Sequence, residues 1–149
     1  MLGKALAEGI ASNPYVHQAD VVVPVPLSTY RRRDRGFNQS EQLAHAVAVE
    51  LDKTLVVDGL RRTRNTKPQA QLDSPAKRVA NVTDAFAVDN RAAIAGKRVL
   101  LVDDVITTGA TVASCAEALH TAPVASVVVA ALAHPFRTQN DADHMPWDI

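Results

Sequence analysis

The polar residues best placed for chemistry lie between Val99 and Thr111, a stretch that reads VLLVDDVITTGAT. An apolar run ends there in two adjacent acids, and hydroxyl-bearing residues and a glycine then open a helical pattern. Gly109 would let the backbone approach a ligand closely, and amides at a helix start point toward an anion. The pattern predicts a phosphate-binding loop, made of Thr107, Thr108, Gly109, Ala110 and Thr111.

The two acids, Asp103 and Asp104, need another kind of partner, because carboxylates beside a phosphate would repel it. A sugar phosphate meets both demands, since its hydroxyls can face the acids and Mg²⁺ with its retained waters can bridge. The alternative is a core strand that ends in a solvated Asp-Asp turn with a threonine cap. The TTGAT run that follows favours the sugar phosphate. A P-loop is excluded, because the chain contains no G-x-x-x-x-G-K-[ST].

Two basic segments stand out in a chain whose 16 basic and 16 acidic residues give no net charge. They are Arg31 to Arg35, which reads RRRDR, and Arg61 to Lys67, which reads RRTRNTK. The planar guanidinium group of arginine can form two parallel hydrogen bonds to a phosphate or a carboxylate. A solvated surface is the other interpretation of such charge runs, and composition does not decide between them.

The elements that would position these residues alternate between strands and helices. Four helices are expected, at 2–12, 40–51, 74–82 and 111–120, and five strands, at 20–23, 54–60, 85–88, 98–102 and 124–133. This order predicts an α/β doubly wound fold with a mainly parallel sheet. Ligands bind such sheets at the carboxyl ends of the strands, which is where the polar segments fall.

Further motifs narrow the interpretation. They are VPVPL at Val23 to Leu27, RGFNQ at Arg35 to Gln39, RNTKPQAQL at Arg64 to Leu72, and Arg78, Asn81 and Phe86. Together with VLLVDDVITTGAT, they resemble the ComF family of type I phosphoribosyltransferases, from about Val21 to Ala133. Many members carry an amino-terminal cysteine-rich zinc module, which has no counterpart in these 149 residues.

The resemblance implies a role for each motif around 5-phosphoribosyl-1-pyrophosphate (PRPP). Asp103 and Asp104 would bind the ribose hydroxyls, and Mg²⁺ through water or PRPP, while Thr107 to Thr111 would hold the 5-phosphate. The pyrophosphate would face Pro26, Leu27, Ser28, Arg31 and Arg35. A flexible hood at 61–81 would close over the site and contribute Arg62, Arg64, Gln69 and Arg78. Residues 1–149 would form one domain, with a tail at 135–149 that lacks a regular pattern.

The implied activity is a Mg²⁺-dependent transfer of the 5-phosphoribosyl group from PRPP to an unidentified small-molecule acceptor, with release of pyrophosphate. No general base is evident, and Thr107 stands where purine-salvage phosphoribosyltransferases carry an acid. One alternative is a non-catalytic PRPP or nucleotide-binding module. Another is competence-related binding of single-stranded DNA by the basic segments, although only 4% of the residues are aromatic and available for stacking on bases.

Smaller features complete the expectations. The lone Cys115 is expected in the core, and so is Phe37. Asn38 or Ser40 is expected to cap the helix at 40–51 with a side-chain oxygen. The longest apolar run, Val124 to Ala133, is far shorter than the ~20 residues of a membrane span. The first residues lack the apolar core of a secretory signal, so we expect a cytoplasmic protein, and a homodimer is left open.

Overall fold

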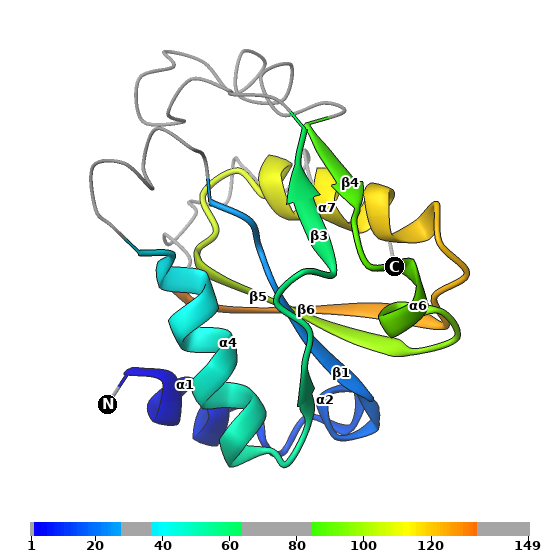
Figure 1. The fold of residues 1–149 in the computed structure, drawn as a ribbon. Coiled ribbons are helices and arrows are strands. Elements are labelled where there is room, and N and C mark those ends of the chain that lie inside the picture. The colour runs from blue at the N-terminus through cyan, green and yellow to red at the C-terminus, as the bar shows by residue number, and fades with distance from the viewer. Residues whose placement is uncertain (1, 28–36, 64–84, 134–149) are drawn as a thin grey trace, which may run out of the picture.

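The computed structural model describes residues 2–27, 37–63 and 85–133 of the chain (Figure 1). The expected helix at 74–82, most of the hood and the tail at 135–149 lie outside these residues. No helix among those described is long and apolar enough to cross a membrane.

The centre of the fold is a four-stranded sheet in the order β2-β1-β5-β6. Its strands are β1 (Val21–Pro24), β2 (Thr54–Leu55), β5 (Arg98–Val105) and β6 (Ser126–Ala133). Every pairing in this sheet is parallel. All four residues of β1 are buried, as expected of a strand covered on both faces. The predicted α/β fold with a parallel sheet is therefore confirmed.

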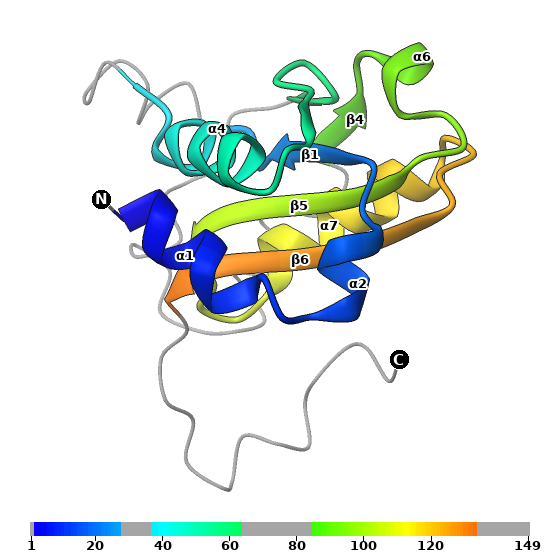
Figure 2. The ribbon, with the colours of Figure 1, turned by 90° about the horizontal axis from the view of Figure 1, so that it is seen from below.

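Helices cover both faces of this sheet (Figure 2). On one face lie α1 (Leu2–Ile10), α2 (Pro14–Gln18) and α4 (Gln39–Glu50). The other face carries α7 (Ala110–His120), α6 (Arg91–Ile94) and a small antiparallel sheet of β3 (Leu60–Arg62) and β4 (Phe86–Val88). Because alternate strand residues point to opposite faces, β5 contributes to both cores. Leu101 packs with Cys115 on the α7 face, and Leu100 packs with Val47 on the α4 face.

The expected single strand at 54–60 was wrong, because the chain changes sheets within it. Thr54 and Leu55 pair with β1, whereas Leu60 begins the separate β3–β4 sheet. Between them, a β-carbon on Gly59 would lie 3.1 Å from a methyl group of Val23. The glycine therefore lets the connecting segment cross closely over the central strand.

Two short helices were not predicted, because neither is long enough to show a periodic apolar pattern. The helix expected at 2–12 ends already at Ile10, and Asn13 and Pro14 begin α2, with the Asn13 side chain accepting a hydrogen bond from the Tyr15 amide. In the same way, the Asn90 side chain accepts from the Ala93 amide and caps α6. The caps thus identify helices that periodicity does not.

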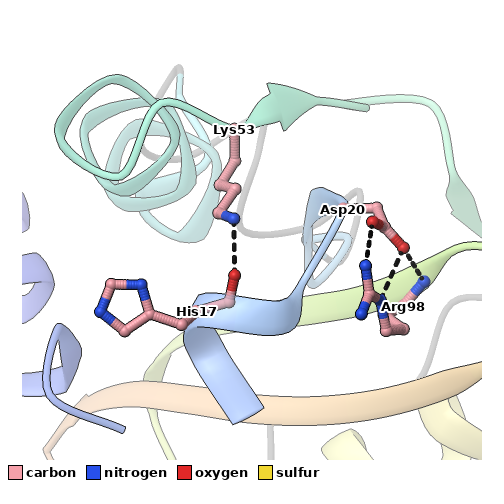
Figure 3. Close-up of polar contacts among 4 residues, drawn as sticks. All are labelled: His17, Asp20, Lys53 and Arg98. Atoms are coloured by element: carbon pink, nitrogen blue, oxygen red, sulfur yellow. Dashed lines mark hydrogen bonds and ion pairs between the residues drawn. The ribbon is translucent and has the colours of Figure 1, made fainter. Parts of the chain in front are cut away.

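The amino ends of β1 and β5 are held together by Asp20 and Arg98 (Figure 3). The Arg98 side chain donates from Nη2 to Asp20 Oδ1 at 2.7 Å and from Nε to Oδ2 at 3.0 Å. Nearby, Lys53 Nζ donates to the carbonyl oxygen of His17 at 2.8 Å, which attaches the end of α4 to α2. These contacts fix one end of the sheet, and the polar motifs lie at the other.

Candidate functional site

The carboxyl ends of β1 and β5 lie side by side and bring two of the predicted motifs together. Pro24 is in register with Val102, and the Val25 amide donates to the Val102 carbonyl oxygen at 2.9 Å. Because the strands are parallel, Pro26 and Leu27 follow β1 at the same edge at which β5 presents its acids. Ser28, Arg31 and Arg35 lie outside the described residues.

The two acids belong to β5 itself rather than to the loop after it, because the pairing of β5 with β6 continues to Val105. Asp103 is buried, with 7% of its surface exposed. Its Oδ1 accepts hydrogen bonds from Ser40 Oγ and from the Asp104 amide, both at 2.9 Å. Burial raises the pKa of Asp103 to about 6, against the opposing effect of these two hydrogen bonds. Burial therefore disfavours the ionised form of this carboxyl, whereas the two hydrogen-bond donors favour it.

Asp104 is in a different environment from its neighbour. It is half-buried, and its Oδ1 accepts from the Val105 amide at 2.8 Å. The pair therefore combines one buried, hydrogen-bonded carboxylate with one that is closer to solvent.

The predicted phosphate-binding loop connects β5 to α7. Gly109 occupies the N-cap position with a left-handed φ of 78°, a conformation that glycine adopts at little cost. Ala110 begins the helix. Thr108 Oγ1 accepts from the Ala110 amide at 3.4 Å, while Thr107 is exposed. A helix start with this geometry can bind an anion through its backbone amides.

The first two residues of the expected hood belong to a strand that continues beyond residue 60, where the sequence predicted it to end. Arg61 and Arg62 belong to β3 and pair with β4. The Arg62 guanidinium lies over the Phe86 ring, 4.9 Å from its centroid, and Arg61 forms an ion pair with Asp89 at 3.2 Å. Arg64, Gln69 and Arg78 lie outside the described residues.

Two polar residues at the start of α4, the N-cap Asn38 and Ser40 in the first turn, make contacts that were not predicted. Asn38 Nδ2 donates to the Val25 carbonyl oxygen at 3.2 Å, and Ser40 donates to Asp103. Asn38 occupies the expected N-cap position of α4, but its side chain makes no capping hydrogen bond, and the Ser40 hydroxyl donates to Asp103 instead. Phe37, expected in the core, is 46% exposed. The polar residues that precede and begin α4 were a sequence signal for this region, but they did not identify Val25 and Asp103 as the partners.

The acids fit a magnesium ion that is bound jointly with a substrate. Mg²⁺ usually takes one or two protein carboxylates, substrate phosphates and several waters. Asp103 and Asp104 can supply such carboxylate oxygens. Within the residues that the structure describes, no group of three or more acidic, histidine or cysteine side chains forms an all-protein metal site.

Comparison with known proteins agrees with this geometry. The sequence profile described as "Phosphoribosyl transferase domain" matches residues 3–149. The chain belongs to the phosphoribosyltransferase domain family. A solved structure of glutamine PRPP amidotransferase from B. subtilis aligns to this phosphoribosyltransferase domain with a TM-score of 0.57 and 29% identity, over 86% of this chain and 24% of that one.

Curated relatives confirm the similarity to competence proteins. DNA utilization protein YhgH from Escherichia coli K12 is 38% identical over 100 residues, which are 67% of this chain and 43% of that protein. Competence protein F from Haemophilus influenzae is 32% identical over 115 residues, which are 76% of this chain and 50% of that protein. The phosphoribosyltransferase domain described here thus spans half or less of these relatives.

Proposed function

We propose that this protein binds PRPP together with Mg²⁺ and transfers the 5-phosphoribosyl group to a small-molecule acceptor, releasing pyrophosphate. The observation that carries the proposal is the position of the buried Asp103 carboxylate. It lies near the carboxyl end of β5, six residues before the left-handed Gly109 that precedes α7. One continuous segment therefore supplies both the carboxylates that can accept hydrogen bonds from sugar hydroxyls and the helix start that can bind an anion.

The phosphate end of the ligand would bind the loop before α7. The groups assigned to it are the backbone and hydroxyls of Thr107, Thr108, Gly109, Ala110 and Thr111. A helix dipole contributes only about 0.3–1 kcal/mol for a favourable charge, so several converging hydrogen bonds must supply most of the affinity. This arrangement would fix the ribose by its 5-phosphate.

The ribose hydroxyls would donate to Asp103 and Asp104. A buried ionised carboxylate is costly unless donors surround it, and Asp103 already accepts two hydrogen bonds. The ribose would supply the remaining donors. Mg²⁺, when bound, would neutralise phosphate charge, with these two acids reaching it directly, through water or through PRPP.

In the proposed reaction, the bond from the anomeric carbon to pyrophosphate breaks and a bond to the acceptor forms, while the proton that the acceptor loses passes to the departing pyrophosphate or to water. Pro26, Leu27 and Ser28, with Arg31 and Arg35, are assigned to the pyrophosphate. Arginines beside the leaving group would stabilise its developing charge. The hood residues Arg62, Arg64, Gln69 and Arg78 would help to exclude water, with Arg62 held in β3 at its base.

Pyrophosphate release tests whether the protein is an enzyme. The protein would be incubated with PRPP, Mg²⁺ and separate nucleobases and amines, and free pyrophosphate would be measured. Acceptor-dependent release that Asp103→Asn abolishes supports transfer. Binding of PRPP without release for any acceptor would instead identify a PRPP-binding module.

The names of the relatives favour a second candidate, binding of single-stranded DNA through the basic segments. Of those segments, the structure describes Arg61, which already pairs with Asp89, and Arg62, which covers Phe86. DNA binding by this route predicts that affinity falls with salt at a log-log slope of about −0.7 per phosphate contact. Replacing Arg61, Arg62 and Arg64 would flatten that slope.

The organisation of the chain as a single domain, its cytoplasmic location and its assembly as a homodimer also stay predictions.

A further inference from the structure

The start of α4 is attached to the carboxyl ends of both central strands. Asn38 Nδ2 donates to the Val25 carbonyl oxygen, just after β1, and Ser40 Oγ donates to Asp103 Oδ1 in β5. The two strand ends are themselves joined, because the Val25 amide donates to the Val102 carbonyl oxygen. Together with the backbone between the bonded residues, these three hydrogen bonds form a closed ring where β1 and β5 end.

Within this ring, Ser40 and Asp103 form a buried pair that is 63 residues apart in sequence, with 3% and 7% of their surfaces exposed. Asp103 Oδ1 accepts two hydrogen bonds, one from Ser40 and one from the Asp104 amide. Two donors on one oxygen fix the rotation of the carboxylate, so the direction of Oδ2 is fixed as well. Hydrogen bonds to an ionised group in a buried setting are stronger than neutral ones.

We infer that Ser40 is a positioning residue that orients the Asp103 carboxylate toward the ribose hydroxyls of the ligand. The inference rests on the proposed function, because it needs a sugar phosphate in the site. Ser40 itself need not touch the ligand, since it acts through Asp103. Loss of its hydroxyl would remove one of the two donors that hold Oδ1 among the residues that the structure describes, and the carboxylate could then turn away from the sugar.

The consequence is specific to the sugar and not to the phosphate. Asp103 is assigned to the ribose hydroxyls, whereas the loop before α7 is assigned to the 5-phosphate. Ribose 5-phosphate and 2-deoxyribose 5-phosphate differ by one hydroxyl and share the phosphate. The ratio of their affinities therefore reports on how well the two acids hold the sugar, and of these acids Ser40 donates to Asp103. A general loss of stability would not change this ratio.

The experiment is calorimetric titration of both sugar phosphates, with Mg²⁺, into the wild-type protein, Ser40→Ala and Ser40→Thr. Thermal unfolding of each protein establishes that it is folded. We expect the wild-type protein to prefer ribose 5-phosphate, Ser40→Ala to reduce that preference about tenfold, and Ser40→Thr, which keeps a hydroxyl, to retain most of it. Ser40→Cys, with a weak donor of similar size, replaces the alanine variant if that variant does not fold.

A matched control is Ser114→Ala, which removes another buried serine hydroxyl, from α7. It should leave the preference unchanged. A full preference in a folded Ser40→Ala protein overturns the inference and leaves the proposed function intact. A folded wild-type protein that binds neither ribose 5-phosphate nor PRPP overturns both, and one that binds the two sugars equally overturns the assignment of Asp103 together with the inference.

Discussion

Asp20 and Arg98 form a bidentate ion pair where β1 and β5 begin (Figure 3). This end of the sheet is opposite the end that carries Asp103 and Asp104. The Arg98 amide also donates to Asp20 Oδ2 at 2.8 Å, so one carboxylate accepts three hydrogen bonds. Hydrogen bonding to the Arg98 side chain holds the pKa of Asp20 well below its usual range. The native state therefore favours the ionised form of this carboxyl.

This pair predicts an acid-sensitive contribution to stability. Because the pKa of Asp20 is lower in the folded state, the contribution is complete above the unfolded pKa of about 3.9 and is lost as the pH falls toward the folded value. Asp20→Asn should lower the free energy of unfolding at pH 7, and the difference from wild type should shrink steadily below about pH 4. Urea unfolding across this pH range measures it.

The matched control for Asp20 is Glu8→Gln, which removes a carboxylate from an exposed pair with Lys4 at 4.0 Å. Such surface pairs contribute little, so this variant should follow the wild-type curve. A difference between Asp20→Asn and wild type that is as large at low pH as at pH 7 would show that the ion pair is not its cause.

Gly109→Ala should impair both stability and anion binding. A residue with a β-carbon is strained at a φ of 78°, at a cost of about 1–2 kcal/mol, and a backbone that shifts to relieve this strain would move the amides at the start of α7. Gly9→Ala is the control, because Gly9 lies within helix α1 with nothing near its added β-carbon. That change should stabilise the protein by about 1 kcal/mol or less. Thermal unfolding and titration with inorganic phosphate would check both, and a Gly109→Ala protein as stable as wild type would contradict the account.

Cys115 should be chemically inert in the folded protein. It is fully buried in the core on the α7 face, and burial raises the pKa of its thiol, with the nearby Asp103 charge adding to the effect. Reactivity depends on the thiolate, which this environment disfavours. A thiol-specific colorimetric reagent at pH 8 should therefore label the single cysteine only after denaturant is added. Rapid labelling of the native protein would place Cys115 at a more open position than the structure does.

The sequence predicted those features that depend on local patterns. The β-branched run at Val21 to Val23 indicated a strand buried on both faces, and β1 is one. Apolar spacing predicted α4 and α7 to within one residue at either end. The run from Asp103 to Thr111 predicted the order of acids, loop and helix start, because all three depend on residues that are adjacent in the chain.

Features that depend on distant contacts could not be predicted in this way. The Ser40–Asp103 hydrogen bond joins residues in separate elements, and nothing in the local pattern of either identifies the other. Phe37 was expected inside because of its residue type, yet its position just before α4 leaves it half-exposed. The expected strand at 54–60 contained enough apolar residues, but the close approach of Gly59 to Val23 divides it between two sheets.

The central claim is that the acids of β5 and the loop before α7 form a PRPP site. Its most direct test is calorimetric titration of PRPP with Mg²⁺ into the wild-type protein and into Asp103→Asn/Asp104→Asn, with Asp52→Asn as the control. Asp52 is exposed, lies just after α4 and has a positive φ that asparagine tolerates. We expect saturable binding by the wild-type protein and by Asp52→Asn, and an affinity reduced about a hundredfold or more in the double variant, since hydrogen bonds to charged groups contribute about 1.5–3 kcal/mol each. Equal binding by the folded double variant, or no binding by the folded wild-type protein, would contradict the account.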